Sequence, residues 1–215
     1  MFSPLGFIGA VVIIDSLPSS QGRTLRLRTA IFFPLLLVAL AVEASFDACP
    51  ANLTAAIPAR EPGAMSGSAF LQRIAHLDGR ARERAIEAEL LRGNIPQFMR
   101  HLEPVRVASD TGGPSATICV TPDYLGIGSD RDFVRVPMGL STAVLVANSF
   151  GFVLPTRKLV DAIYITSNRR LKPIPMTPGP NMQSTEYFGR HNALIQKQIN
   201  GAAWGLIAGH KKDLV

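Results

Sequence analysis

The chain has 215 residues, of which 47% are hydrophobic, and it carries a formal net charge of +6. This length provides for one domain with a substantial core and does not require two, and the apolar fraction excludes wholesale disorder. The basic excess can attract anionic lipid, nucleic acid or an anionic wall polymer, but its dispersal along the chain favours an ordinary solvated surface.

The N-terminal region predicts an export signal over residues 1–44. Arg23, Arg26 and Arg28 precede an apolar run over residues 30–42, and Ala44 completes a triplet with small residues where signal peptidase needs them. We therefore expect the mature protein to begin at Ser45 and to lie in the periplasm or outside the cell, where nucleic acid is not a partner.

Two alternatives for this region stay open. Residues 30–44 could be retained as a membrane anchor, although the run is shorter than the roughly 20 residues of a span and contains Pro34. Residues 1–22 make an unusual start for a signal, and they are either a wrongly assigned beginning, which we favour, or the first half of a two-segment anchor.

The chain has two cysteines, Cys49 and Cys119. In an oxidising compartment they can form one disulfide. Cys49 is alternatively a lipid acceptor, which the preceding residues 46–48 fit poorly, and Cys119 within an apolar pattern is most simply a small buried hydrophobic residue. Neither cysteine makes a metal site alone.

Residues 45–66 are rich in Ala, Pro and Gly without periodicity, which predicts a tether.

A helical hairpin is predicted after the tether. Ser66 or Ser68 is expected to cap its first helix, and Asp78 its second, which extends to about Arg92. A short third helix is expected over residues 96–102.

The period then changes to two, which predicts a small antiparallel sheet. Its strands are expected at residues 105–107, 117–121, 124–127 and 133–136. Further helices are expected over 141–149, from Pro155–Thr156 onward, and from Ser184 to Gln198, with a stiff extended segment at 172–182 and an interrupted strand at 204–215. The prediction is a single α+β domain over residues 67–215. The strand pattern that runs into Val215 predicts that the domain continues beyond it.

Several short stretches within residues 70–215 carry a resemblance. They are Val120–Leu125, Gly128–Asp130, Leu154–Thr156, Lys158, Val160–Asp161, Met182–Ser184, His191–Asn192 and Gly209–Leu214. In these stretches the chain resembles a family of uncharacterised exported bacterial proteins. The resemblance implies export and a further C-terminal stretch, and it assigns no chemistry.

Three residues are the candidates for catalysis. His191 and Asn192 lie in the middle of a predicted helix, where they could serve as a general base and a hydrogen-bond donor if that helix lines a cleft. His210 lies in the densest polar run of an apolar region. A partly buried histidine with a satisfied partner and an exposed strand end are the plain interpretations of these positions.

Four basic residues are candidates for anion binding. Lys211 and Lys212 accompany His210, and Arg157 and Lys158 open a predicted helix whose free amides could hold an anion. No cofactor is expected. No metal site is expected either, because no two histidines have close helical spacing and the aspartates near residues 126–128 match no EF-hand loop.

The leading functional hypothesis is an exported bacterial hydrolase of the cell envelope or the extracellular space, acting through His191, Asn192 and His210. The competing hypothesis is a non-catalytic envelope protein that contacts an anionic polymer. That function requires one shared face for a set of basic residues, namely Arg80, Arg84, Arg169, Arg170 and Lys172. A membrane-anchored protein is the third possibility.

Overall fold

The structure, a computed structural model, describes residues 12–14, 48–109, 112, 115–200 and 205–209. The apolar run of the predicted signal or anchor and the His210–Lys212 stretch lie outside these residues, so the predictions made for them stay predictions. Among the helices of the described part, none combines the length and the apolar character that crossing a bilayer requires.

The protein has an α+β fold, as its sequence predicts. Its helices are α1 (Gly67–Arg73), α2 (Gly79–Leu91), α3 (Leu140–Phe150), α4 (Arg157–Thr166) and α5 (Thr185–Ile199), with 3₁₀ turns at Ala51–Thr54, Gln97–Arg100 and Pro180–Gln183. Ser66 and Ser184 cap α1 and α5 through their hydroxyls, as expected, whereas Asp78 occupies the N-cap position of α2 without a side-chain cap bond. The expected third helix is only a 3₁₀ turn.

The strands are β1 (Val12–Ile14), β2 (Glu103–Val107), β3 (Ala116–Val120), β4 (Gly126–Gly128), β5 (Phe133–Arg135), β6 (Arg169–Arg170) and β7 (Ile207–Ala208). They form two antiparallel sheets, in the orders β1-β3-β2 and β4-β5, and a parallel β6-β7 pair, where the sequence predicts one sheet. The chain leaves the first sheet at Pro122, which has no N–H to donate, and the Thr121 hydroxyl closes the turn on the Asp123 carbonyl at 3.0 Å.

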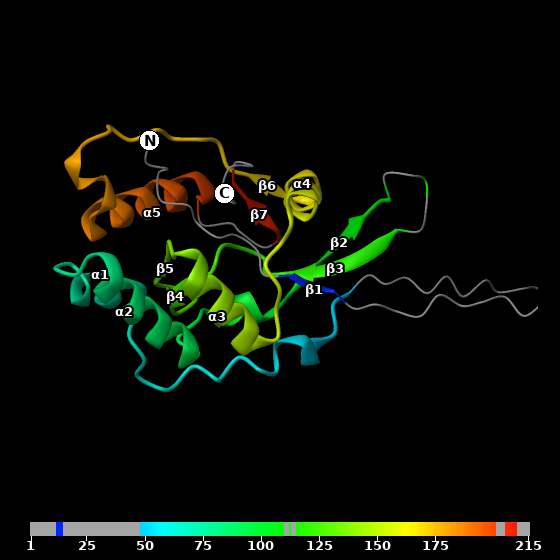
Figure 1. Cartoon of the computed structure of the whole chain (residues 1–215), viewed down its shortest axis with the longest axis horizontal. Helices are drawn as coiled ribbons and strands as arrows, with labels where there is room; N and C mark the ends of the chain where they lie inside the picture. The colour runs from blue at the N-terminus through cyan, green and yellow to red at the C-terminus, as the bar shows by residue number, and fades with distance from the viewer. Residues whose placement is uncertain (1–11, 15–47, 110–111, 113–114, 201–204, 210–215) are drawn as a thin grey trace, which may run out of the picture.

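Figure 1 shows two ends of the molecule. At one end α1, α2, α3 and α5 surround the β4–β5 hairpin, and at the other the β2–β3 ribbon lies beside α4. The larger core belongs to the helical end, where Phe70, Ile86, Ile127 and Phe188 are fully buried. A smaller core joins the inner face of β2 and β3 to α4. The β4–β5 hairpin therefore sits where α1 and α5 both contact it, which is the position of the site described below.

Residues 50–66, which the sequence predicts to be a tether, are instead part of the folded protein. Ile57 is buried in the larger core, and Arg100 donates to the Ile57 and Pro58 carbonyls at 2.9 and 2.7 Å. Arg60 donates to Asn94 at 2.9 Å. Hydrogen bonds with Arg100 and Asn94, which are distant in the sequence, hold this segment in place. It is therefore ordered without the hydrophobic periodicity of a helix or strand.

The cysteines Cys49 and Cys119 form a disulfide whose Cα atoms lie 5.8 Å apart. The bond closes a loop with a sequence separation of 70 residues and joins Cys49 to the C-terminal part of β3. Cys119 is thus buried, as expected, and paired.

Candidate ligand-binding cleft

A cleft of about 830 Å³ opens between α1, the β4–β5 hairpin and α5. Ser68 and Leu71 line it from α1, the 130–135 segment from the hairpin, and Ala193 and Gln196 from α5. Its volume lies within the 300–1,000 Å³ that small-molecule sites usually occupy.

Two glycines allow α1 to begin directly against the hairpin. A Cβ atom at Gly67 would lie 2.5 Å from the Phe133 carbonyl carbon, and one at Gly128, whose φ is +129°, would lie 2.3 Å from the Asp132 carbonyl oxygen. The Gly67 N–H donates to that same Asp132 oxygen at 2.8 Å. Only glycine permits this approach, which sets the hydroxyls of the first turn of α1 at the mouth of the cleft.

The floor of the cleft is a buried polar network. Arg135 has 1% of its surface exposed and forms an ion pair with Asp123, to which its Nε donates at 2.9 Å and its Nη2 donates as well. Asn192 of α5 accepts from the Arg135 backbone N–H at 3.2 Å and from its Nη1 at 3.3 Å. One arginine thereby ties the turn before β4 to β5 and α5.

Burial raises the pKa of Asp123 above its ordinary value, and the hydrogen bonds and charge of Arg135 and the N–H of Tyr124 oppose that rise. A bidentate guanidinium against the carboxylate gives each buried charge its counter-ion. The charges of the floor therefore balance each other. The network holds the turn before β4, strand β5 and helix α5 together.

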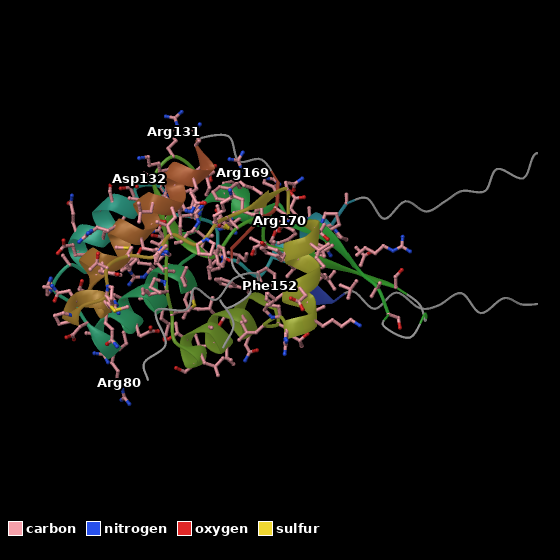
Figure 2. All side chains as sticks on the ribbon, turned by 90° about the horizontal axis from the view of Figure 1, so that it is seen from above. Arg80, Arg131, Asp132, Phe152, Arg169 and Arg170 are labelled. Carbon is pink, nitrogen blue, oxygen red and sulfur yellow. A yellow bond between two sulfur atoms is a disulfide. The ribbon has the colours of Figure 1, made fainter. Side chains whose placement is uncertain are left out.

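The mouth of the cleft carries charges that remain in contact with solvent. Asp130 and Arg131 are exposed, and Asp132 is half-buried. Asp132 accepts from the Ser68 backbone N–H at 3.0 Å and from the Ser68 hydroxyl at 2.5 Å. Figure 2 shows Arg131 projecting outward beside Asp132. Two carboxylates against one guanidinium leave the mouth with a net negative charge.

Asp132 stays ionised at neutral pH. Burial alone would raise its pKa, but hydrogen bonds from the hydroxyls of Ser68 and Ser66 and from the Ser68 N–H outweigh burial and bring the pKa below the ordinary 3.8. Its charge also lies at the N-terminus of α1, which favours an anion.

An aromatic pair forms one wall of the cleft. The rings of Phe98 and Phe133 meet edge to face, with centroids 5.2 Å apart, and both line the cavity. The Arg135 guanidinium lies 5.0 Å from the Phe133 ring centroid. Leu71 and Ile199 add further apolar surface. The wall thus offers apolar and aromatic contact beneath a charged mouth.

The predicted catalytic pair is not brought together in this cleft. Asn192 lines it, but its amide oxygen accepts from Arg135. His191 does not line the cleft. Successive residues of a helix point about 100° apart, and the residues of α5 that line the cleft, among them Gly189, Ala193 and Gln196, share a helix face that does not include position 191. Partial burial lowers the pKa of His191 below its ordinary value.

The other predicted site residues lie elsewhere. Arg157 and Lys158 are exposed at the start of α4, where the Thr156 hydroxyl accepts one of the free N–H groups, and their anion-binding role stays a prediction. Three of the basic residues required for a polymer surface do not lie together. Figure 2 shows Arg80 at an edge of the molecule well away from Arg169 and Arg170, and Arg170 donates to the Tyr164 carbonyl at 3.0 Å.

Within the described ranges, no three histidine, cysteine or acidic side chains gather closely enough to hold a metal ion. The residues that the sequence analysis missed are Arg135 and the aromatic pair. An arginine inside an otherwise apolar strand pattern was the available signal, because such a charge needs a buried partner.

Comparisons with protein-family models, with curated proteins and with solved structures find no match for this chain.

Proposed function

We propose that the chain is an exported bacterial protein that binds a small molecule in the cleft between α1, the β4–β5 hairpin and α5. The ligand class that fits best has an apolar or aromatic body and a positively charged group. The observation that carries the proposal is the combination of an aromatic wall with the negatively charged mouth of a cleft of about 830 Å³.

The lining supports a cationic ligand with an apolar body. Phe98 and Phe133 present ring surface that can pack against such a body, and aromatic faces also attract cations. Asp132 keeps its negative charge at neutral pH and Asp130 is exposed beside it. The floor adds no net charge, because Asp123 and Arg135 neutralise each other, so the mouth determines the sign of the preferred ligand.

A binding role is preferred here to the hydrolase of the leading sequence hypothesis. The amide oxygen of Asn192 is engaged by Arg135, and a hydrogen-bonded partner in the interior is the simpler role for this side chain. Any catalytic part for His191 or His210 stays a prediction of the sequence.

Two features support export. The basic residues and apolar run of the leader are typical of a signal, and the Cys49–Cys119 disulfide is the kind of bond that persists in oxidising compartments. Cell fractionation with N-terminal sequencing of the envelope product is expected to give a chain that begins at Ser45. An intact Met1 would contradict cleavage, and a cytosolic protein would contradict export.

The ligand class is tested with three probes of similar size and different charge: phenethylamine, phenethyl alcohol and phenylacetate. Isothermal titration is expected to rank the amine first, by about fivefold over the alcohol, because one partly exposed charge pair contributes about 1 kcal/mol. Phenylacetate is expected to bind least.

A variant that fills the cleft locates the binding site. Ala193→Trp places an indole into the cleft from an exposed position of α5 and is expected to abolish amine binding. Ala75→Trp, at an exposed alanine outside the cleft, is the matched control and should bind as the unaltered protein does. Equal binding of all three probes, or binding that survives Ala193→Trp, would contradict the proposal.

A further inference from the structure

Among the residues that the structure describes, β1 alone pairs with one edge of β3, the central strand of the three-stranded sheet. β3 pairs with β2 on one side and with β1 on the other, and β1 lies opposite residues Ile118–Val120. Without β1, β3 would become an edge strand of a two-stranded ribbon that is supported by α4.

The register defines which backbone groups face β1. Pro104 lies opposite Cys119 and has no N–H, so this pair is the non-hydrogen-bonded one of the β2–β3 ladder. The N–H and C=O of Cys119 therefore point to the other side, where Ile13 lies directly opposite and can exchange both bonds.

The two outer sides of the β2–β3 ribbon differ in chemistry. β2 carries Glu103, Pro104 and Arg106, and charges and a proline are the residues that keep an edge strand from pairing with other chains. β3 reads Ala-Thr-Ile-Cys-Val and has neither a charge nor a proline. The sequence of β3 is thus suited to a strand that is always covered.

We propose that this side of β3 is an interaction surface for an extended, apolar, β-branched segment of a partner polypeptide, which pairs antiparallel in place of Val12–Ile14. The chemistry of that occupant is taken from the Val-Ile-Ile segment seated there in the full chain. Strand addition of this kind recognises the partner through its main chain, and β-branched residues favour the extended form.

Export gives the surface its biological setting. Residues ahead of the apolar run of a signal stay on the cytoplasmic side, while the residues after it cross the membrane. Because Val12–Ile14 lie ahead of that run and β3 lies after it, the exported domain would lose β1 and its β3 edge would open. In this respect the inference rests on the removal of residues 1–44, and it does not depend on the cleft.

The test uses the full chain and releases β1 by a single substitution. Ile13→Pro removes the N–H that faces Cys119, Ile13→Gly weakens the strand without removing that group, and Ile13→Val is the conservative control. The probe is a fluorescein-labelled peptide with the sequence of residues 9–17, GAVVIIDSL, whose binding is followed by fluorescence anisotropy.

The peptide is expected to bind Ile13→Pro more than about tenfold tighter than the unaltered chain or Ile13→Val, because the tethered strand competes at an effective concentration of about millimolar. Ile13→Gly should lie between them and provides the test if the proline variant does not fold. A peptide with proline in place of its central isoleucine should not bind. Hydrogen exchange at the Cys119 amide should speed up in Ile13→Pro and slow again when the peptide is added.

Equal peptide binding by all four proteins would overturn the inference, as would exchange at Cys119 that the peptide does not change. Dimers of Ile13→Pro that exclude the peptide, detected by light scattering, would also overturn it, since they would assign this edge to a second copy. Phenethylamine binding measured on the same proteins should be unaffected, so a failure here is separate from a failure of the proposed function.

Discussion

The floor and the mouth of the cleft use the same kinds of side chain for different purposes. At the floor, Asp123 and Arg135 each expose 1% of their side-chain surface and neutralise each other. At the mouth, Asp130 and Arg131 are exposed, and Asp132 is bonded to the first turn of α1. Burial separates the two cases: buried charges need a counter-ion beside them, while charges in contact with water can remain without one and can face a ligand.

The largest effect is expected where the floor loses one charge. Arg135→Met leaves the Asp123 carboxylate buried without a counter-ion, so the free energy of unfolding should fall by about 3–5 kcal/mol. Urea denaturation measures the change. The double variant Asp123→Leu/Arg135→Met removes both charges and should recover most of the loss. A single variant within about 0.5 kcal/mol of the parent protein, the usual range for a surface site, would contradict the assignment of this pair to the interior.

A smaller loss is expected from Asn192→Leu. This substitution leaves the Arg135 backbone N–H without its acceptor inside the protein, and one unsatisfied buried group costs about 1–3 kcal/mol. Thermal unfolding followed by circular dichroism measures it. Gln196→Leu, a neighbouring change on the same helix that removes no bond of the floor, should be nearly neutral; equal losses would argue against the Asn192 contact.

At the mouth, Asp132→Asn should cost at most about 1 kcal/mol at neutral pH, because the carboxylate is partly exposed and the amide keeps one acceptor for α1. Hydrogen bonds lower the pKa of Asp132 in the folded state. Its stabilisation is therefore complete above the unfolded pKa near 4, and it is lost as the pH falls through the lower folded value.

The difference in unfolding free energy between Asp132→Asn and the unaltered protein should thus shrink below about pH 4. A constant difference across the acid range would show that the charge contributes nothing.

The smallest effect concerns His191, which lies outside the cleft. Burial lowers its pKa in the folded state, so the unfolded chain takes up a proton first as the pH falls. The protein should therefore lose stability from about pH 6.5 downward, and His191→Gln should remove part of that slope. Melting temperatures of both proteins between pH 5 and 8 test this, and parallel curves would contradict it.

Much of the fold could be predicted because the signals are local. Ser66 and Ser184 stand directly before their helices, and each hydroxyl accepts an N–H from the residue three positions later. The change from helical to alternating periodicity near Val105 likewise needs only neighbouring residues, and it gave the α+β class.

The cleft could not be predicted, because its parts are distant in the chain. Arg135 and Asn192 are separated by 57 residues, and nothing in either local pattern indicates that they meet. The segment ahead of α1 was expected to be a tether for the same reason, since Arg100 contacts Ile57 across 43 positions. His191 was chosen for its residue type, which does not reveal the side of α5 on which it lies.

Chemical-shift mapping with phenethylamine tests the central claim most directly. If the mouth binds a cationic ligand while the floor is structural, backbone amide shifts should concentrate at Phe98, Asp130, Asp132 and Ala193 and should leave α4 unchanged. They should also disappear in Ala193→Trp. Shifts confined to the surface of α4, or no shifts at millimolar amine, would contradict the assignment of this cleft as the binding site.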